Sequence, residues 1–516
     1  MPRHRLFFFI LLAALGLIRL LYLLRSPLDL VADEAYYWEW SRHLDWSYFS
    51  KGPMVAWIIA LSTRLGGHTE FFVRLPAVVL SFIALAAAYE LTRRLFDSEK
   101  RAFWTAAAFA GTPLLSVGSI LMTIDNPLFC FWMLAMLACF EAARTNRMRW
   151  WLALGVFIGL GLATKAAMAF FIPSMLLYLA LKPDGPRRLR EAGPWIAIGL
   201  AILFFVPQLV WNARHGFVMF KDFASKGGAE NPFKFNPLYT LRFIAYQLAV
   251  ISPIMFGIAV WGSWKAVGTG LRERSDPALY LASMLLPVAA FYLLLSLHAK
   301  LHANWMAVGY GGALIAGANA WMDLGDRLAG QPGGSADAPS EAERARKRIR
   351  WRRWSAAGLA LGFALGAVLF IPNPLYLTPW KDAAAQSDWQ RRLYGWRQLG
   401  QRVDQLRAEM PAGVPVMLAA KKYQIAAQLS FYTQGQETAW VLASGPYENQ
   451  YYFLNNFESA IGRNGIYVAE NEEDGDRAEE AFERTEFAGR LVAIREGAAV
   501  KTFYLWKCWN FLGWPY

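Results

Sequence analysis

Residues 6–24 read LFFFILLAALGLIRLLYLL, and this stretch decides the fold class. Arg19 is its one charge, and at about 1.5 Å per helical residue it can cross about 30 Å of hydrocarbon. A helix that is apolar on every side needs lipid or a large core around it. The preceding Met1-Pro-Arg-His-Arg could open a secretory signal peptide. However, the run is too long for a signal-peptide core and no small-residue cleavage site follows, so we expect a first membrane helix.

The composition extends this expectation to the whole chain. Its 516 residues are 56% hydrophobic and only 18% charged, which is too apolar for an ordinary soluble protein. Apolar runs of the same kind recur, and we predict a polytopic α-helical membrane protein with about eleven transmembrane helices. The runs span residues 6–25, 71–92, 103–121, 126–143, 150–163, 166–181, 194–212, 241–262, 278–297, 303–321 and 355–371.

The positive charges predict how these helices are oriented. A net charge of +13 could suggest nucleic acid, but the cations form short clusters between apolar runs, so anionic membrane lipid is the expected counterpart and no nucleic acid is. If every cluster is cytoplasmic, each successive pair is separated by two crossings. The N-terminus is then cytoplasmic. The membrane that we expect to hold the chain is a bacterial inner membrane. The clusters are Arg3/Arg5, Arg93/Arg94/Lys100/Arg101, Arg144/Arg147/Arg149, Lys182/Arg187/Arg188/Arg190, Lys265/Arg272/Arg274 and 344–353.

The composition changes after residue 322. We predict a transmembrane domain over 1–322, a basic cytoplasmic linker over 323–353, a last transmembrane helix over 354–371 and a periplasmic mixed α/β domain over 372–516. Within that last domain, strands are expected at 414–420, 439–444, 466–470 and 500–507, with a helix at 422–432. No internal repeat is found.

The predicted outer segments hold the unusual polar residues. Asp33 and Glu34 follow the first helix and precede Tyr36 and Tyr37, aromatics suited to a membrane interface or to stacking on a sugar. A juxtamembrane acid beside ordinary belt aromatics is the alternative interpretation. Lys51, at a Gly-Pro turn, could bind phosphate or extend to the interface.

Other outer turns repeat this chemistry. Asp125 and Asn126 could bind substrate or simply cap a helix before a proline, whereas Lys165, in an apolar hairpin, is a functional candidate because buried charge is costly. His298 and His302 could be metal ligands, but no third ligand accompanies them, so phosphate or sugar hydroxyls are better partners and no cofactor is expected. The three cysteines are expected to be packing residues. Lys165, Arg214 and Lys300 are further candidates for binding the donor phosphate, and Asn304 is a candidate for substrate.

These motifs together resemble the GT-C superfamily of membrane glycosyltransferases, in the branch of protein O-mannosyltransferases and the lipid A aminoarabinose transferase. The resemblance spans about residues 1–320, and the C-terminal domain, with 424–432 and 449–452, looks like that of bacterial members. One departure is Gly52, which separates Lys51 from Pro53 where the aminoarabinose transferases have Lys-Pro. The motifs are Asp33-Glu34, Tyr48-Phe-Ser-Lys-Gly-Pro, Asp125-Asn-Pro, Gly161-Leu-Ala-Thr-Lys and His298-Ala-Lys-Leu-His-Ala-Asn-Trp.

The resemblance implies an inverting transfer of a sugar from a polyprenyl-phosphate donor to an extracytoplasmic hydroxyl of a glycolipid, lipopolysaccharide or protein. It implies Asp33 as general base and Lys51 as phosphate ligand. A lipid phosphate leaves readily once cations meet its charge, so one base and a few cations suffice; Glu34 is the second acidic candidate. A transporter or flippase of lipid-linked sugars is the main rival. A transporter should carry charges near the middle of its membrane runs, which here are nearly uncharged apart from Lys165 and Glu90. A ligase that transfers a whole glycan is a third possibility.

Overall fold

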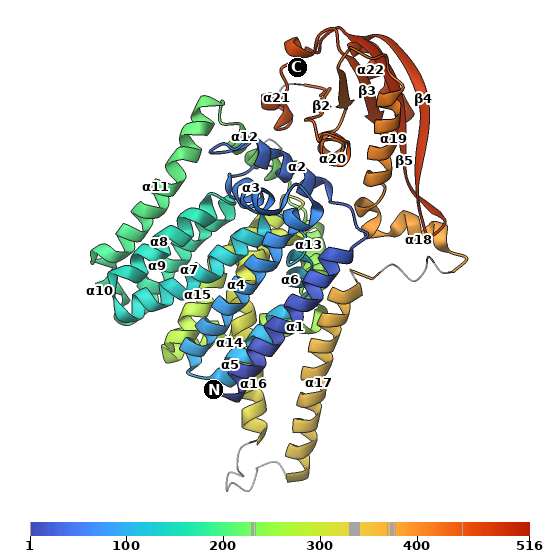
Figure 1. Cartoon of the computed structure of the whole chain (residues 1–516). Helices are drawn as coiled ribbons and strands as arrows, with labels where there is room; N and C mark the ends of the chain where they lie inside the picture. Colours follow the sequence, from blue (N-terminus) through green and yellow to red (C-terminus); the bar gives the residue numbers. More distant parts are fainter. Residues whose placement is uncertain are drawn as a thin grey trace. The chain divides into compact units, whose positions relative to one another are not determined.

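The structure is a computed structural model that describes residues 2–515 except 229–231, 233, 330–340, 369, 372–375, 377 and 446. Helices occupy the chain up to residue 368 and a five-stranded sheet follows (Figure 1). The first helices are α1 Arg3–Arg25, α2 Ala32–Arg42, α3 Met54–Gly66, α4 Glu70–Phe96, α5 Glu99–Ala110, α6 Pro113–Gly118, α7 Asp125–Thr145, α8 Met148–Leu162, α9 Phe171–Leu181 and α10 Gly185–Leu189. The next are α11 Ala192–Arg214, α12 Val218–Lys226, α13 Pro237–Ile251, α14 Pro253–Glu273, α15 Asp276–Ser296, α16 Tyr310–Ala329 and α17 Glu341–Val368.

Several helices are long and apolar enough to cross a membrane. Among the described residues there are five, namely α1, α4, α7, α11 and α15, and six if the bent pair α13–α14 counts as one span. Shorter apolar helices, including α3 and α8, lie below that length. The chain is therefore a multi-pass helical membrane protein, as predicted.

Two predicted runs are broken in the structure. Residues 241–262 were expected as one helix, but α13 and α14 meet at an angle of 110°. Pro253 cannot donate a backbone hydrogen bond, and Ser252 before it has a φ of 79°, outside the helical region. Likewise 103–121 is divided into α5 and α6 at Thr112, whose side chain caps Pro113–Gly118. Hydropathy reports the apolar length of a run but not such breaks.

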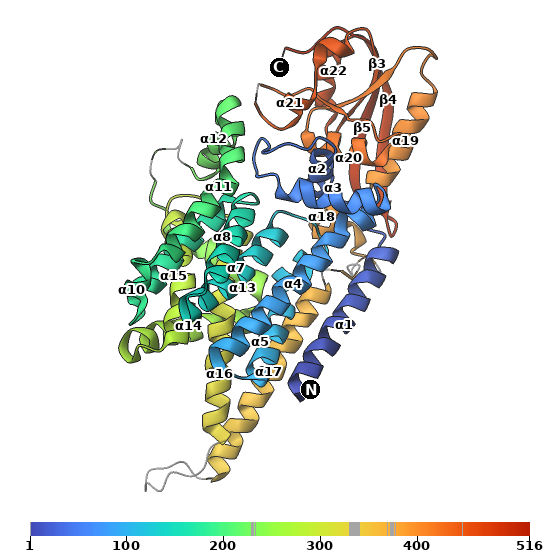
Figure 2. The ribbon, with the colours of Figure 1, turned by 60° about the vertical axis from the view of Figure 1, so that its left-hand side comes forward.

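The predicted linker 323–353 is helical at both ends. Helix α16 continues to Ala329, and α17 begins at Glu341, so the basic stretch 344–353 is helical; the rest of the linker lies outside the described residues. Arginine, lysine and alanine are good helix formers, which explains why this stretch extends the membrane helix. Both views show α16 and α17 side by side (Figure 2).

The chain forms two compact units. The helical unit comprises residues 1–22, 75–214 and 223–370, and the sheet unit comprises 23–74, 215–222 and 371–516. In the helical unit α8 packs on α7 and α11, and α14 packs on α16. Cys130 and Cys139 are buried here as free thiols, and Cys508 is buried in the sheet. Residues 26–70, the predicted first outer segment, therefore belong with the C-terminal residues, although the sequence placed them with the transmembrane domain.

The sheet has the order β2-β1-β3-β5-β4, with β1 parallel to β2 and β3, and β5 antiparallel to β3 and β4. The predicted mixed α/β domain is confirmed in its strands β1, β2, β3 and β5 and in helix α20. Strand β4 was missed, because it is a sheet edge whose residues are mostly half-buried or exposed and carry no clear alternation. The strands are β1 Val416–Ala420, β2 Trp440–Val441, β3 Asn464–Ala469, β4 Phe482–Arg495 and β5 Ala498–Phe511. The helices are α18 Lys381–Ser387, α19 Trp396–Ala408, α20 Tyr423–Tyr432, α21 Tyr451–Leu454 and α22 Asp476–Ala481.

Candidate active site

Glu34 lies inside the sheet unit, in a buried ion pair with Arg74. The exposed fractions of the two side chains are 0% and 2%, and Arg74 Nη2 donates to Glu34 Oε2 at 2.8 Å. Arg74 also donates to the carbonyl oxygens of Leu28 and Asp29, while Glu34 accepts from the backbone N–H of Val31 at 3.0 Å. The carboxylate is thus enclosed and fully engaged, which favours a role in fixing the start of α2.

Asp33, one residue earlier, is exposed in the first turn of α2. Its carboxylate is close to Tyr423, the first residue of α20: burial, Asp33 and Asp222 together raise the pKa of Tyr423 to about 12. The phenol therefore stays protonated at neutral pH. Asp33 is the acid of the pair that a substrate from solvent can reach.

Tyr36 and Tyr37 are buried rather than displayed for a ligand. The hydroxyl of Tyr36 accepts from the backbone N–H of Gln450 at 2.6 Å, and its ring packs on Tyr423 at 4.5 Å between centroids. Gln450 also accepts, through Oε1, from the backbone N–H of Phe49 at 2.7 Å. Tyr36 thus fixes α2 to the C-terminal segment.

Lys51 lies in the turn that connects α2 with α3. Its carbonyl oxygen accepts from the backbone N–H of Tyr48 at 3.1 Å, and the Tyr48 ring stacks on Trp40 at 4.5 Å and 10°. Gly52 and Pro53 are buried, whereas Lys51 is half-buried. The turn holds the backbone of Lys51 in a fixed place within the sheet unit.

In the helical unit, three predicted residues from distant turns meet. Lys165 Nζ donates to Asp125 Oδ1 at 2.8 Å, and Asn304 Nδ2 donates to Asp125 Oδ2 at 2.5 Å. The exposed fractions of Lys165 and Asp125 are only 14% and 20%. The capping interpretation of Asp125 is wrong, because Ile124 is the N-cap of α7 and no side chain caps it. This Asp125 cluster joins the starts of α7 and of the segment 303–309 to the α8–α9 hairpin.

Asn126 supports that cluster from its own turn. Its Oδ1 accepts from the hydroxyl of Thr123 at 3.1 Å, and its amide donates to the carbonyl oxygen of Gly118. Both Asp125 and Asn126 border a cavity of about 50 Å³ within the helical unit. Asn126 therefore holds the backbone of its turn, and its role towards a substrate stays a prediction.

A second group surrounds His298. The imidazole Nδ1 accepts from the backbone N–H of Lys234 at 3.0 Å, so Nε2 carries the proton and donates to the carbonyl oxygen of Gly228 at 3.2 Å. His298 thereby connects two stretches around a pocket of about 690 Å³. Three lysines line this lysine pocket, namely Lys226, Lys234 and Lys300. Such a pocket suits an anionic group.

The remaining candidates stand apart. Arg214 is exposed at the end of α11, and His302 is exposed with its ring 5.8 Å from that of Trp305. No contact in the described part of the chain brings either into the Asp125 cluster. Nor do the described residues contain a group of three or more His, Cys, Asp or Glu that could hold a metal ion.

Sequence reasoning missed Asp29, Lys226 and Lys234. Asp29 is buried, and its Oδ2 accepts from the backbone N–H of Trp396 at 2.8 Å, at the N-terminus of α19. Nothing local marks it, since its partner is distant in sequence. The two lysines could have been found from the basic outer stretch 213–240 that holds Arg214.

The fold defines a class: a multi-pass helical membrane protein with a C-terminal mixed-sheet domain. Residues 50–211 match the family described as Dolichyl-phosphate-mannose-protein mannosyltransferase. The structure of ArnT from Cupriavidus metallidurans bound to undecaprenyl phosphate has the same fold, with a TM-score of 0.60 over 96% of this chain and 97% of that one, at 14% identity. The family match over residues 50–211 and the shared fold agree with the resemblance that the sequence motifs predicted.

Two curated proteins specify the similarity further. A lipid A galacturonosyltransferase, RgtD, of Rhizobium johnstonii is 29% identical over 283 residues, which cover 55% of this chain and 58% of the relative. An undecaprenyl phosphate-alpha-4-amino-4-deoxy-L-arabinose arabinosyl transferase of Pseudomonas aeruginosa PAO1 is 30% identical over 274 residues, covering 50% and 47%. The chain thus spans about half the length of the curated relatives it matches.

Proposed function

We propose that this protein is an inverting glycosyltransferase that moves a sugar from a polyprenyl-phosphate donor to an extracytoplasmic hydroxyl of a glycolipid of the lipid A type. The observation that carries the proposal is the Asp125 cluster, in which three outer turns distant in sequence meet through polar side chains. A purely structural helical bundle has no need to gather an acid, a cation and an amide at one end. The names of the two curated relatives support the choice of lipid A over a protein acceptor.

The proposed topology has about eleven crossings, in which shorter apolar helices such as α8 and α9 also cross. The N-terminus is cytoplasmic and the sheet lies in the periplasm of a bacterium. The basic clusters between the apolar runs support this orientation. Both Asp33 and the Asp125 cluster are then extracytoplasmic.

We assign Asp33 as the general base. Its carboxylate can take the acceptor's proton as the hydroxyl attacks the anomeric carbon of the sugar. The bond from that carbon to the donor phosphate breaks on the opposite face, which inverts the centre. The lipid phosphate leaves as an anion and needs no acid, so Glu34 has a positioning role through Arg74.

Cations stabilise the leaving phosphate in this proposal. Lys51 and Lys300 are the first phosphate ligands of the proposal. A turn holds the backbone of Lys51, and Lys300 lines the lysine pocket. Arg214 is a further phosphate ligand of the proposal. Lys165 is ion-paired with Asp125, so its charge is already compensated and it acts by positioning Asp125 and Asn304. His298, His302, Tyr36 and Tyr37 support the substrate-binding segments.

The test is transfer by the full chain in membranes, with labelled undecaprenyl-phosphate 4-amino-4-deoxy-L-arabinose or galacturonic acid as donor and lipid A as acceptor. Asp33→Asn should lower kcat at least about 100-fold, the usual scale for loss of a general base. Asp45→Asn, which changes an exposed acid of the same segment, is the matched control and should keep full activity. Full transfer by Asp33→Asn would refute the base assignment.

A phosphate role makes a different kinetic prediction. Lys51→Ala should raise the KM for donor more than it lowers kcat, since it removes an interaction present before and during reaction. The rival function, transport of a lipid-linked sugar, would show as movement of labelled lipid across vesicles without cleavage of the sugar–phosphate bond.

A further inference from the structure

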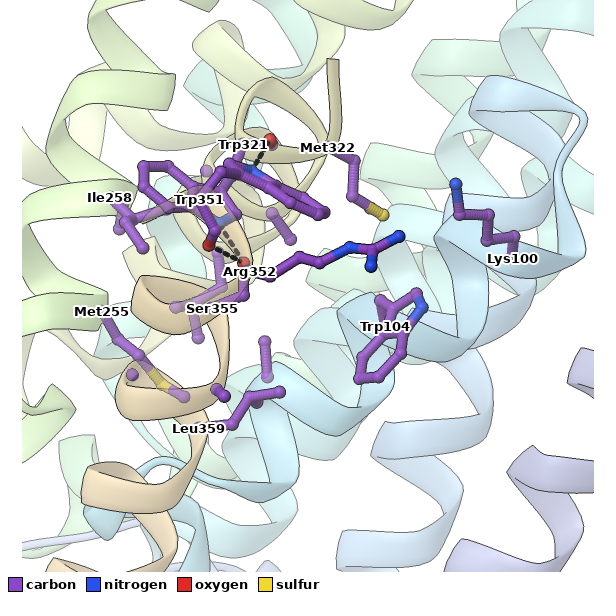
Figure 3. Close-up of a pocket in the computed structure, with 17 residues that line it drawn as sticks. Lys100, Trp104, Met255, Ile258, Trp321, Met322, Trp351, Arg352, Ser355 and Leu359 are labelled. Carbon is purple, nitrogen blue, oxygen red and sulfur yellow. Dashed lines mark hydrogen bonds between the residues drawn. The ribbon is translucent and has the colours of Figure 1, made fainter. Parts of the chain in front are cut away.

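An apolar pocket of about 360 Å³ opens between α5, α14, α16 and α17 in the helical unit, away from every residue assigned above (Figure 3). Its volume falls in the range of about 300–1,000 Å³ that small-molecule sites occupy. Lys100 and Trp104 line it from α5, Trp321 from α16, and Trp351 and Arg352 from α17.

The pocket is built into the way α17 packs. At one end, Gly362 approaches α5 so closely that a Cβ there would lie 2.3 Å from the carbonyl oxygen of Gly111. At the other end, a Cβ on Gly325 would lie 2.4 Å from the Trp351 ring. Between these two approaches α17 presents Ala356 and Gly358 to the pocket. Such small residues cannot fill the space, so the gap persists between two fixed points.

Away from Lys100 and Arg352, the walls are apolar. The indole N–H of Trp321 donates to the Ser355 hydroxyl at 2.8 Å, and that of Trp351 donates to the carbonyl oxygen of Trp321 at 2.9 Å. The Ser355 hydroxyl in turn donates to the carbonyl oxygen of Trp351 at 2.8 Å. Because these polar atoms are mutually satisfied, an occupant needs no hydrogen-bonding groups where it meets the walls.

One side of the pocket is strongly basic. The side chains of Arg352 and Lys100 lie on the same side, with the Arg352 guanidinium directed towards Lys100 (Figure 3). No carboxylate pairs with Arg352 in the described part of the chain. Lys100 contacts Asp326 at 3.3 Å, but both side chains are half exposed, and such a surface pair is weak.

Charge around the pocket extends well beyond these two residues. Residues 344–353 of α17 hold seven cations and no acid. The chemistry of the site is therefore an apolar slot beside a cationic mouth, which matches an acyl chain attached to an anionic headgroup.

We propose that this pocket binds one acyl chain of an anionic membrane phospholipid, whose phosphate is held by Arg352 and Lys100. The bound chain fills the gap between α17 and α16 and so holds α17 against the bundle. The basic clusters that contain Lys100 and residues 344–353 are those assigned to the cytoplasm. A phospholipid of that leaflet is accordingly the occupant, and the polyprenyl donor, used at the opposite end, is not.

Native mass spectrometry of the purified full chain tests the proposal, with phosphatidylglycerol or phosphatidylcholine titrated into detergent. Phosphatidylglycerol should bind about fivefold or more tightly than phosphatidylcholine, and Arg352→Gln should remove most of that preference. Arg353→Gln is the matched control: it removes the next cation of the same helix, which does not line the pocket, and should change neither affinity. Ala318→Phe, which fills the pocket from α16, should abolish retention of the bound phospholipid.

Three outcomes would overturn the proposal. The first is equal affinity for the two phospholipids. The second is an equal loss of phosphatidylglycerol affinity in Arg352→Gln and Arg353→Gln, which would indicate diffuse surface charge. The third is tighter binding of undecaprenyl phosphate than of phosphatidylglycerol. The two arginine variants decide the matter even if Ala318→Phe fails to fold.

Discussion

Asp33 and Glu34 are neighbours in sequence but lie in opposite environments, because successive residues of an α-helix point about 100° apart. The sequence could identify the acidic pair at the end of the first membrane run. It could not tell which acid faces solvent, since the partner of Glu34 is Arg74, forty residues later. The same limit applies to Asp29, whose partner Trp396 belongs to the far end of the chain.

The Glu34–Arg74 pair makes a prediction about stability. Glu34→Gln should lower the free energy of unfolding by about 3–5 kcal/mol, because it leaves the Arg74 guanidinium buried without a counter-charge. The double variant Glu34→Gln/Arg74→Met should recover part of that loss. Thermal unfolding in detergent measures both, with Asp33→Asn as the exposed neighbour that should unfold like the wild type. If Glu34→Gln lost activity at unchanged stability, Glu34 would have a direct role in chemistry.

Asp29 predicts a dependence of stability on pH. Burial raises the pKa of Asp29 to about 6, against the opposing effects of the Trp396 N–H and of Arg397. The folded protein therefore holds this proton between about pH 4 and 6, where the unfolded chain has lost it, and stability falls as the pH rises through that window by up to about 3 kcal/mol. Asp29→Asn removes this dependence of stability on pH.

A comparison of Asp29→Asn with the wild type should show directly whether stability falls or rises with pH. The unfolding temperature of the variant, relative to wild type, should rise from pH 4 to pH 6 and then level off. Asp45→Asn, which changes an exposed carboxylate of the same segment, is the control for this comparison. A difference that falls with pH for Asp29→Asn would mean that the ionised carboxylate is net stabilising.

Among the helices, the length of an apolar run predicted the long spans reliably, whereas the sequence did not predict how the helices break and pack. The long spans α1, α4, α7, α11 and α15 all fall on predicted runs. The two helices of the first outer segment were not foreseen, since α3, with 13 residues, is too short to cross a membrane. The bend at Ser252 was likewise invisible to hydropathy, because a broken span and a straight one have the same composition.

The crossing of α14 and α16 depends on two glycines. A Cβ on Gly262 would lie 2.4 Å from the Cα of Gly317, so the backbones of the two helices touch there. Gly262→Ala should therefore lower the free energy of unfolding by about 1–3 kcal/mol. Gly257→Ala and Gly268→Ala are matched controls on the same helix, since nothing lies within 4 Å of a Cβ at either position.

The free energy of unfolding of both controls should equal that of the wild type or exceed it by up to about 1 kcal/mol, because alanine has a higher helix propensity than glycine. Unfolding temperatures of the three variants in one detergent make the comparison. Equal unfolding temperatures of all three variants would show that the close approach of the two helices does not contribute to stability.

At the scale of the whole molecule, the sequence predicted the class of fold and the ends of the helices where polar residues gather. It assigned Asp125, Lys165 and Asn304 to one outer face from three separate turns, and these three are in contact. What it could not supply is the division into units, because the hydrogen bonds that define the sheet unit join residues about 400 apart. Hydrophobic pattern reports local structure, and such bonds leave no trace in it.

We expect the sheet unit to depend on the first outer segment for its stability. Asp29 accepts from the Trp396 N–H at 2.8 Å, Gln428 donates to the Leu30 carbonyl oxygen at 2.8 Å, and the Tyr36 hydroxyl accepts from the Gln450 N–H at 2.6 Å. A fragment of residues 378–515 loses all three hydrogen bonds and exposes the apolar side of α20. This fragment should therefore unfold at a lower temperature than the same residues in the full chain, and a protease should cut it faster. Fusing residues 26–53 to the fragment through a flexible linker should restore protection, whereas the same fusion carrying Asp29→Ala and Tyr36→Phe should restore much less. Circular dichroism and limited proteolysis measure these differences. A bare fragment as stable as the fusion would show that the C-terminal residues form their domain unaided and that the first outer segment only rests against it.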